Sequence, residues 1–196
     1  TIAVDEATDT VGTMHHLFLG VHHMDKDKVI GSIGKGIPKL LVFCQTKRNC
    51  DRVARNLEEL GIDAQAMHGD MQQSSRERTL RKFAEGKLQV LVATDVAARG
   101  LDVPRISHVI NYDVPYDTES YVHRIGRTGR AGRKGDAILF VAPREKRMLH
   151  TIERATRQRI EQMDLPTYEQ INTHRIDRFK QKVRDTLGNG EHLEFY

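Results

Sequence analysis

Short apolar runs recur along the chain, separated by segments in which apolar residues stand three or four positions apart. The runs that predict strands are Met14–Val21, Lys39–Cys44, Asp63–Met67, Leu88–Ala93, Ser107–Asn111 and Asp136–Val141. Several of them are apolar throughout rather than alternating, which is typical of strands that a parallel sheet buries on both faces. The pattern therefore predicts a parallel sheet whose strands are connected by the intervening segments.

Those intervening segments carry the signals of amphipathic helices and of their ends. Helices are predicted over Met24–Ile33, from Thr46 to Gly61, over Arg76–Glu85, from about Thr118 into an arginine- and glycine-rich stretch, and from Pro143 through Met163. Thr46 suits a helix cap, Gly61 a helix end and Pro143 a first turn. Strands alternating with helices imply right-handed crossovers, and hence an α/β fold with a parallel sheet flanked by helices.

Composition divides the chain into a short start, a main domain and a polar tail. Residues 1–13 are acidic and non-periodic, like the end of a preceding domain, and residues 14–165 carry the alternating pattern. Residues 166–196 predict a helical extension with a frayed end, in which Thr167 and Gln170 fit a capping box. The apolar stripe of this extension is Ile176, Phe179, Val183 and Leu187.

Such a short helix is marginal in water, so its stripe needs a surface to cover. Three surfaces are open to it: the flank of the main domain, a second copy of the chain, or a following domain. We favour the flank of the main domain, because so few apolar residues make a small interface for a stable dimer. Dimerisation through the extension stays open as an alternative.

Composition and charge narrow the class of protein. Of the 196 residues, 38% are hydrophobic and 30% are charged, and the net charge is +4 with a pI near 9.1. This mild basicity is compatible with a nucleic-acid partner. No apolar run approaches the roughly 20 residues of a membrane span, and no signal peptide is recognisable. Cys44 and Cys50 predict reduced thiols in a cytoplasmic protein, and the start at Thr1 indicates a fragment.

Candidate chemistry gathers in the stretch Tyr121–Lys134. Arginine recurs at every third position and so does glycine: Arg124, Arg127, Arg130, Arg133, Gly126, Gly129, Gly132 and Gly135. A guanidinium group binds two phosphate oxygens at once, and glycine lets the backbone approach a ligand closely. On one helical turn Arg127 and Arg130 would converge on a single anion. The stretch therefore indicates a polyphosphate clamp, with a solvated basic loop as the alternative.

Further polar residues follow the predicted strands directly. They are Thr46, Lys47, His68–Asp70, Thr94–Asp102 and Asp113. In open parallel sheets, ligands bind outside the carboxyl ends of the strands, where these residues are expected. Thr94 is placed to donate to a phosphate and Asp102 to accept from a ribose hydroxyl, although an aspartate after a strand is also a common helix cap.

Other patterns resemble functional motifs but lack their essential residues. Gly31–Gly36 resembles a phosphate-binding loop, but Val29 occupies the place of its first glycine and Gly36 that of its hydroxyl. Asp5–Thr8 resembles a DEAD box, but in this sequence no phosphate-binding loop stands before it. His15, His16, His22 and His23 have no cysteine or carboxylate placed to complete a tetrahedral metal site.

Taken in order, the motifs resemble a known family. They are Leu41–Lys47, His68–Asp70, Gln73–Arg76, Ala93–Asp102, Val109–Asp113 and Tyr121–Arg130. This series is similar to the C-terminal RecA-like lobe of a DEAD-box ATP-dependent RNA helicase over residues 14–165. The tail more loosely resembles the extension of bacterial cold-shock DEAD-box helicases. The resemblance implies a RecA-like three-layer fold with a C-terminal helical extension.

The resemblance also implies roles for individual residues. Arg127 and Arg130 match the catalytic arginine fingers on the ATP γ-phosphate, and Asp102 matches the ribose contact, with Gly100 assigned to the same nucleotide site. Positions that hold or support the RNA backbone are Thr46, Gly69, Gln73, Arg76 and Thr94, to which we add Lys47 beside Thr46. Asp95, Arg99 and His123 match positions that couple the RNA and ATP sites. Gln72 departs from the family's helix-capping serine.

The implied activity is ATP-driven unwinding of short RNA duplexes, together with an N-terminal lobe that would hold most of the nucleotide and the Mg²⁺. RNA would be gripped by its backbone, without sequence preference. The alternative is a non-catalytic RecA-like module that binds RNA or a protein. The presence of Arg127, Arg130 and Asp102 together favours the enzyme. A DNA helicase is a weaker alternative, since only the resemblance favours RNA.

Overall fold

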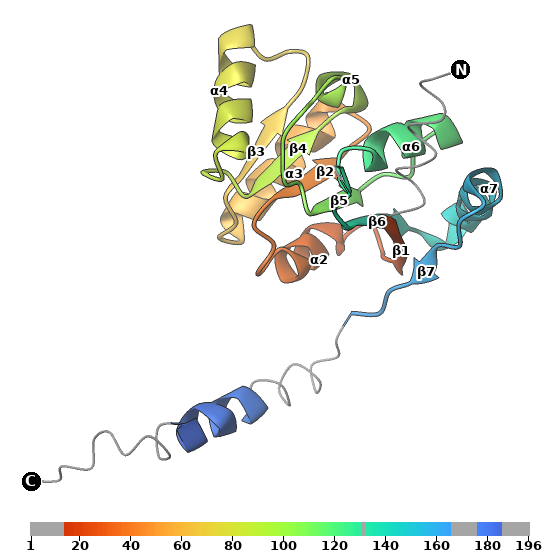
Figure 1. Cartoon of the computed structure of the whole chain (residues 1–196). Helices are drawn as coiled ribbons and strands as arrows, with labels where there is room; N and C mark the ends of the chain where they lie inside the picture. The colour runs from red at the N-terminus through yellow and green to blue at the C-terminus, as the bar shows by residue number, and fades with distance from the viewer. Residues whose placement is uncertain (1–13, 131, 166–175, 186–196) are drawn as a thin grey trace, which may run out of the picture. The chain divides into compact units, whose positions relative to one another are not determined.

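The computed structural model describes residues 14–130, 132–165 and 176–185 (Figure 1). The chain divides into two units, Thr1–Met163 and Asp164–Tyr196, and each is described by itself. The acidic start with its DEAD-like Asp5–Thr8, the capping box at Thr167 and the stripe residue Leu187 lie outside the described residues.

The first unit is built on a seven-stranded sheet in the order β3-β4-β2-β5-β6-β1-β7. Its strands are β1 (Met14–Gly20), β2 (Leu40–Phe43), β3 (Ala64–Met67), β4 (Val90–Ala93), β5 (His108–Asn111), β6 (Gly135–Val141) and β7 (Glu161–Gln162). All of the paired strands run parallel. The parallel sheet that the apolar runs predicted is confirmed.

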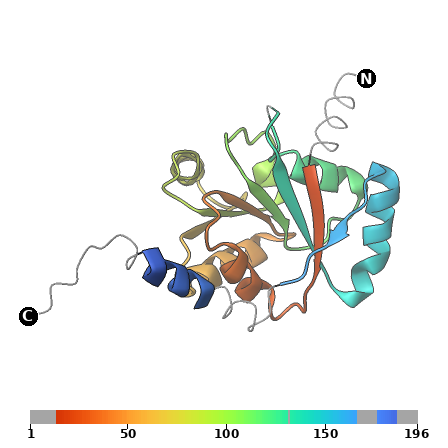
Figure 2. The ribbon, with the colours of Figure 1, turned by 60° about the horizontal axis from the view of Figure 1, so that its bottom comes forward.

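Helices cover both faces of this sheet. They are α2 (Lys26–Ile33), α3 (Lys47–Glu59), α4 (Gln73–Ala84), α5 (Asp95–Ala98), α6 (Thr118–Ile125) and α7 (Lys146–Thr156), with the 3-10 turn η1 (Pro143–Glu145) before α7. The helices α2 and α3 lie on one face, and α4 to α7 lie on the other (Figures 1 and 2). The three-layer arrangement follows from apolar residues on both faces of the central strands.

Two apolar clusters join the sheet to α4–α7. In one, Leu41, Leu91 and Val109 of the sheet pack with Phe83 of α4 and Ala97 of α5. The second cluster contains Leu139, Tyr121, Ile125, Leu149 and Ile152, which come from β6, α6 and α7. Because these clusters fix the helices firmly on the sheet, the loops at the carboxyl ends of the strands have a rigid base.

The helix predicted from Pro143 through Met163 is shorter than expected. The helix α7 ends at Thr156, because Arg157 adopts the left-handed conformation with φ of 54°. The chain then turns back, and Glu161–Gln162 pairs with Leu17–Phe18 of β1. Ile160 is buried as expected, but from this returning segment rather than from the helix. The prediction of a continuous helix was therefore wrong.

The other helix signals agree more closely with the structure. Thr46 caps α3 by accepting a hydrogen bond from the Asn49 amide at 3.2 Å. The helix α4 begins at Gln73, three residues before the predicted start, and Gln72 makes no side-chain cap hydrogen bond there. None of the helices in the described residues combines the length and hydrophobicity needed to span a bilayer.

Candidate functional site

The residues assigned to RNA lie along the carboxyl edge of the sheet. Thr46 and Lys47 follow β2, Gly69 follows β3, and Thr94 follows β4. Gln73 and Arg76 lie in the first turn of α4, which is connected to β3 by a short loop. Because the strands are parallel and adjacent, residues far apart in the sequence share one edge. The structure therefore places Thr46, Lys47, Gly69 and Thr94 at one edge, as the strand-end argument predicted for them. Asp102, which the same argument placed there, instead lines a pocket with Lys39 and Ser107, at the starts of strands.

The arginine- and glycine-rich stretch forms a loop between α6 and β6. The helix α6 ends at Ile125, so Arg127 and Arg130 do not share a helical turn. They converge by contacts to one segment instead. Arg127 Nη1 donates to the Leu101 carbonyl at 2.9 Å, and Arg130 Nη1 donates to Asp102 Oδ1 at 2.8 Å. Burial, and secondarily the charge of Arg130, lower the pKa of Arg127.

Small residues allow this loop to fold tightly against the start of β6. Gly129 has a φ of 66°, in the left-handed region that favours glycine. Thr128 is buried and donates its hydroxyl to the Ile106 carbonyl. A Cβ atom at Gly135 would lie 2.5 Å from both the Gly129 nitrogen and Thr128 Oγ1. The backbone of the loop thereby fixes the starting points of the two arginine side chains.

A surface pocket collects the residues assigned to coupling. Asp95, Arg99 and His123 line it together with Arg124 and Arg127. The His123 ring lies 3.4 Å from Glu119 and both side chains are exposed. The coupling residues therefore lie beside Arg127, on the same part of the lobe surface.

Arg124, to which sequence reasoning gave no role of its own, is the most completely buried arginine of the stretch, with 1% exposure. Its Nε and Nη2 atoms donate to the two carboxylate oxygens of Asp95, at 2.6 and 2.8 Å. Its Nη1 donates to the Asp113 carbonyl at 2.7 Å and to Asn111 Oδ1 at 3.3 Å. The guanidinium also lies over the ring of Phe43. The position of Arg124 between the apolar Tyr121 and Ile125 was the available sequence signal.

At the carboxyl edge of the sheet, the residues assigned to RNA already make contacts within the lobe. Thr46 and Thr94 each accept a helix-capping hydrogen bond, which leaves their hydroxyl hydrogens available to a phosphate. Lys47 Nζ donates to Asp70 at 2.6 Å, and this contact lowers the pKa of Asp70. An added Cβ at Gly69 would be in contact with the end of Lys47.

The two α4 residues assigned to RNA differ in their surroundings. Gln73 donates to Glu77 at 3.0 Å on the exposed side of the helix. Arg76 Nε is buried and has no hydrogen-bond partner among the described residues. A buried donor without a partner is costly, and such groups are commonly satisfied by a ligand or by water. Arg76 is therefore suited to an anionic ligand at this edge.

The glycine pattern at Gly31–Gly36 and the histidine cluster, which resembled functional motifs in the sequence, do not form such sites in the structure. Gly31–Gly36 forms the end of α2 and the following turn, whereas a phosphate-binding loop precedes its helix. His16 is buried beside the Tyr121 hydroxyl at 2.8 Å, and His15 contacts Asp136. Within the described ranges, no group of histidine, cysteine and carboxylate side chains is arranged to hold a metal ion.

Comparison with known proteins identifies two family domains in the chain. The "Helicase conserved C-terminal domain" matches residues 26–132, and the "RNA helicase DeaD dimerization domain" matches residues 166–196. The ATP-dependent RNA helicase DeaD of Mycobacterium tuberculosis is 52% identical over 157 residues, which cover 80% of this chain and 28% of that protein. The chain thus spans less than a third of the length of this curated relative.

Solved structures show the same relationship. The Escherichia coli DEAD-box protein SrmB, bound to regulator of ribonuclease activity A, is 35% identical with a TM-score of 0.74, over 78% of this chain and 91% of that one. Saccharomyces cerevisiae Dbp5 bound to RNA and ADP BeF3 is 34% identical with a TM-score of 0.73, over 84% and 44%. These similarities confirm the RecA-like fold. The chain therefore belongs to the DEAD-box helicase family and contains the C-terminal RecA-like lobe of that family.

Proposed function

We propose that this chain is the C-terminal half of an ATP-dependent RNA helicase and acts with an N-terminal, ATP-binding lobe. The observation that carries the proposal is the convergence of Arg127 and Arg130 on the Leu101–Asp102 segment. Two guanidinium groups beside a carboxylate suit a nucleotide, because they bind phosphate oxygens while the carboxylate accepts from a ribose hydroxyl. The name of the Mycobacterium tuberculosis relative supports the same activity.

In this proposal the two arginines act as fingers across the gap between the lobes. Each uses its Nε and Nη1 atoms for contacts within the lobe. These contacts hold the guanidinium planes in place before the nucleotide arrives, so little reorganisation is needed when the lobes close. Positive charge would then offset the charge that develops on the transferred phosphoryl group. Asp102 and Gly100 lie at the same segment and complete the nucleotide contacts of this lobe.

The nucleotide supplies the phosphoryl bond that is hydrolysed, and Mg²⁺ would neutralise charge on its phosphates. As the resemblance implies, we assign that metal and most of the nucleotide contacts to the N-terminal lobe. What this lobe contributes is positive charge and orientation. It is therefore expected to be inactive towards ATP by itself.

RNA would lie along the carboxyl edge of the sheet. Thr46, Gly69, Gln73, Arg76 and Thr94, with Lys47, offer hydroxyl, amide and cationic donors. Such donors suit phosphate and sugar oxygens and do not distinguish base edges. We therefore propose sequence-tolerant binding of one RNA strand, coupled to the nucleotide site through Asp95, Arg99 and His123. Closure on ATP would strain a short duplex and separate its strands.

The extension is proposed to join two copies of the chain. Residues 166–196 match a dimerization domain, and Ile176, Phe179 and Val183 expose 52%, 69% and 40% of their surface in the helix that spans residues 176–185. This match favours a second copy over the flank of the main domain, which the sequence pattern alone favoured.

The finger assignment is tested by kinetics of the chain joined to its N-terminal lobe. We expect Arg127→Ala and Arg130→Ala each to lower RNA-stimulated kcat for ATP by roughly 10³-fold. Nucleotide affinity should change much less, because the contact strengthens mainly in the closed state. The chain alone should show no ATPase.

The matched control is Arg147→Ala, which removes an exposed arginine of α7 and should leave kcat unchanged. Near-wild-type turnover in both finger variants would disprove the role of the arginines. A wild-type protein without RNA-stimulated ATPase would disprove the proposed function itself.

A further inference from the structure

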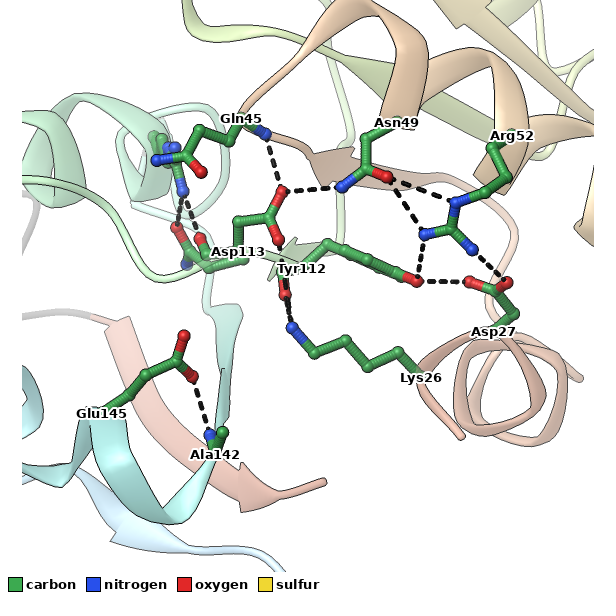
Figure 3. Close-up of polar contacts among 11 residues, drawn as sticks. Lys26, Asp27, Gln45, Asn49, Arg52, Tyr112, Asp113, Ala142 and Glu145 are labelled. Atoms are coloured by element: carbon green, nitrogen blue, oxygen red, sulfur yellow. Dashed lines mark hydrogen bonds and ion pairs between the residues drawn. The ribbon is translucent and has the colours of Figure 1, made fainter. Parts of the chain in front are cut away.

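A polar network outside the proposed ligand contacts lies behind the start of α3 (Figure 3). It joins Lys26 and Asp27 of α2, Asn49 and Arg52 of α3, and Tyr112 and Asp113, which follow β5. We call these six residues the Asp113 network. Four of its hydrogen bonds, counting the one from the Gln45 amide, connect residues more than sixty positions apart, so the network forms only when the lobe is folded.

The carboxylate of Asp113 holds the turn that leads into α3. Its Oδ2 atom accepts from the Gln45 amide at 2.8 Å and from Asn49 Nδ2 at 3.4 Å. Its Oδ1 atom lies 3.9 Å from Lys26 Nζ, and the two side chains are only 20% and 7% exposed. A carboxylate that is shielded from water strengthens its hydrogen bonds to the donors it retains.

Lys26 is itself held in place by Tyr112. Its ammonium donates to the Tyr112 carbonyl at 2.7 Å and lies 4.9 Å from the centre of the Tyr112 ring. A buried ammonium is stable only where such partners replace its water. The carbonyl and ring of Tyr112 therefore keep a positive charge next to Asp113.

The Tyr112 hydroxyl connects α2 to α3 on the other side of the network. It donates to Asp27 Oδ1 at 2.7 Å and accepts from Arg52 Nη2 at 3.1 Å. Burial, followed by the hydrogen bond to Asp27, raises the pKa of Tyr112 far above its ordinary value, so the hydroxyl stays protonated. Arg52 also donates to Asn49 Oδ1, and this bond connects the Tyr112 hydroxyl to the start of α3.

Asp113 also contacts Arg124 through its backbone. Its backbone carbonyl accepts from Arg124 Nη1 at 2.7 Å, and Arg124 in turn holds Asp95. Asp113 thus contacts both the turn that carries Thr46 and Arg124, which lines the pocket formed by Asp95, Arg99 and His123.

We propose that Asp113 is a positioning residue for RNA binding, which fixes the Gln45–Thr46 turn so that Thr46 and Lys47 face the RNA backbone. The inference rests on the proposed function, because it assigns RNA to this edge. Asp113 does not touch the ligand itself. Loss of the Asp113 carboxylate should release the turn. RNA affinity should then fall, while kcat for ATP hydrolysis at saturating RNA is retained.

The first test measures how well the Gln45–Thr46 turn is held in place. Hydrogen exchange of the Gln45 amide is compared in this chain with wild-type sequence, Asp113→Ala and Asp113→Asn. The alanine variant should exchange about tenfold faster or more, as expected for the loss of a hydrogen bond to a charged acceptor. The asparagine variant keeps an acceptor oxygen and should stay within about threefold of wild type.

The second test measures RNA-stimulated ATPase in the chain joined to its N-terminal lobe. For Asp113→Ala, the RNA concentration giving half-maximal stimulation should rise about tenfold, with kcat at saturating RNA within about twofold of wild type. Asp113→Asn should recover most of the RNA affinity. Asp63→Ala, which removes an exposed aspartate at the opposite edge of the sheet, serves as the matched control.

The outcomes separate the inference from the function it rests on. Unchanged half-saturation in Asp113→Ala, with a wild type that RNA stimulates, would overturn the positioning role and leave the helicase function intact. A wild type that RNA does not stimulate would overturn the proposed function and the RNA role together. If Asp113→Ala fails to unfold cooperatively, Asn49→Ala, which removes one donor to the same carboxylate, replaces it. An unchanged half-saturation there would likewise overturn the inference.

Discussion

The individual arginines between Tyr121 and Lys134 have very different surroundings. Arg127 and Arg130 reach the surface, whereas Arg124 is buried and divides its donors between Asp95, Asn111 and the Asp113 carbonyl. A planar guanidinium can serve all of these acceptors at once. Arg124 therefore stabilises the fold, a role that its place in a repeating Arg/Gly pattern does not reveal.

Removal of Arg124 should destabilise the lobe markedly. We expect Arg124→Ala to lower the free energy of unfolding by about 2–4 kcal/mol, less than for a fully buried pair because Asp95 is partly exposed. Arg124→Lys should recover less than half of the loss, since one ammonium cannot bridge both oxygens of Asp95. Urea denaturation measures both values. Arg154→Ala, an exposed arginine of α7, should change the free energy by less than about 0.5 kcal/mol.

At the scale of elements, the loop between α6 and β6 is held by close backbone contact. Gly135→Ala would place a Cβ atom against the Gly129 backbone and the buried Thr128, neither of which can move freely. Such overpacking should cost about 1–3 kcal/mol of stability and lower RNA-stimulated kcat, because the loop carries both fingers. Gly20→Ala, at the end of β1, meets no atom within 4 Å and is the control. Equal effects of the two substitutions on thermal unfolding and turnover would contradict this account.

The elements also show what the sequence can and cannot specify. Continuous apolar runs predicted the central strands, because a short run that is apolar throughout is typical of a strand covered by helices on both faces of a parallel sheet. The end of α7 was missed because Ile160 continues the helical spacing of Leu149 and Ile152, although it is buried from a returning segment. Arg157 offers no signal for its left-handed turn, which glycine or asparagine would have given.

The candidate site was predictable to the extent that topology determines it. Polar residues after parallel strands must share one edge, so Thr46, Thr94 and Asp113 could be placed together from the sequence alone. The pairings could not be predicted in this way. Lys26 meets Tyr112, and Arg124 meets Asp95, only through the tertiary fold, and neither pair has a periodic signature in the sequence.

For the whole molecule, the remaining prediction concerns assembly through the extension. Within residues 176–185, Ile176, Phe179 and Val183 lie on one side of the helix and are exposed, and the segment falls within the dimerization-domain match. We expect the wild-type chain to sediment as a dimer at micromolar concentration, because apolar side chains from two copies would shield one another from water.

Phe179→Asp should convert that dimer to a monomer, since a carboxylate would be buried without a partner in the interface. Arg178→Asp introduces the same residue on the opposite side of the helix and should leave the dimer intact. The urea midpoint of the main domain should be the same in both variants, because the proposed interface is formed by the extensions of two copies. A wild-type monomer throughout the micromolar range, or a Phe179→Asp dimer, would show that these side chains do not form the interface.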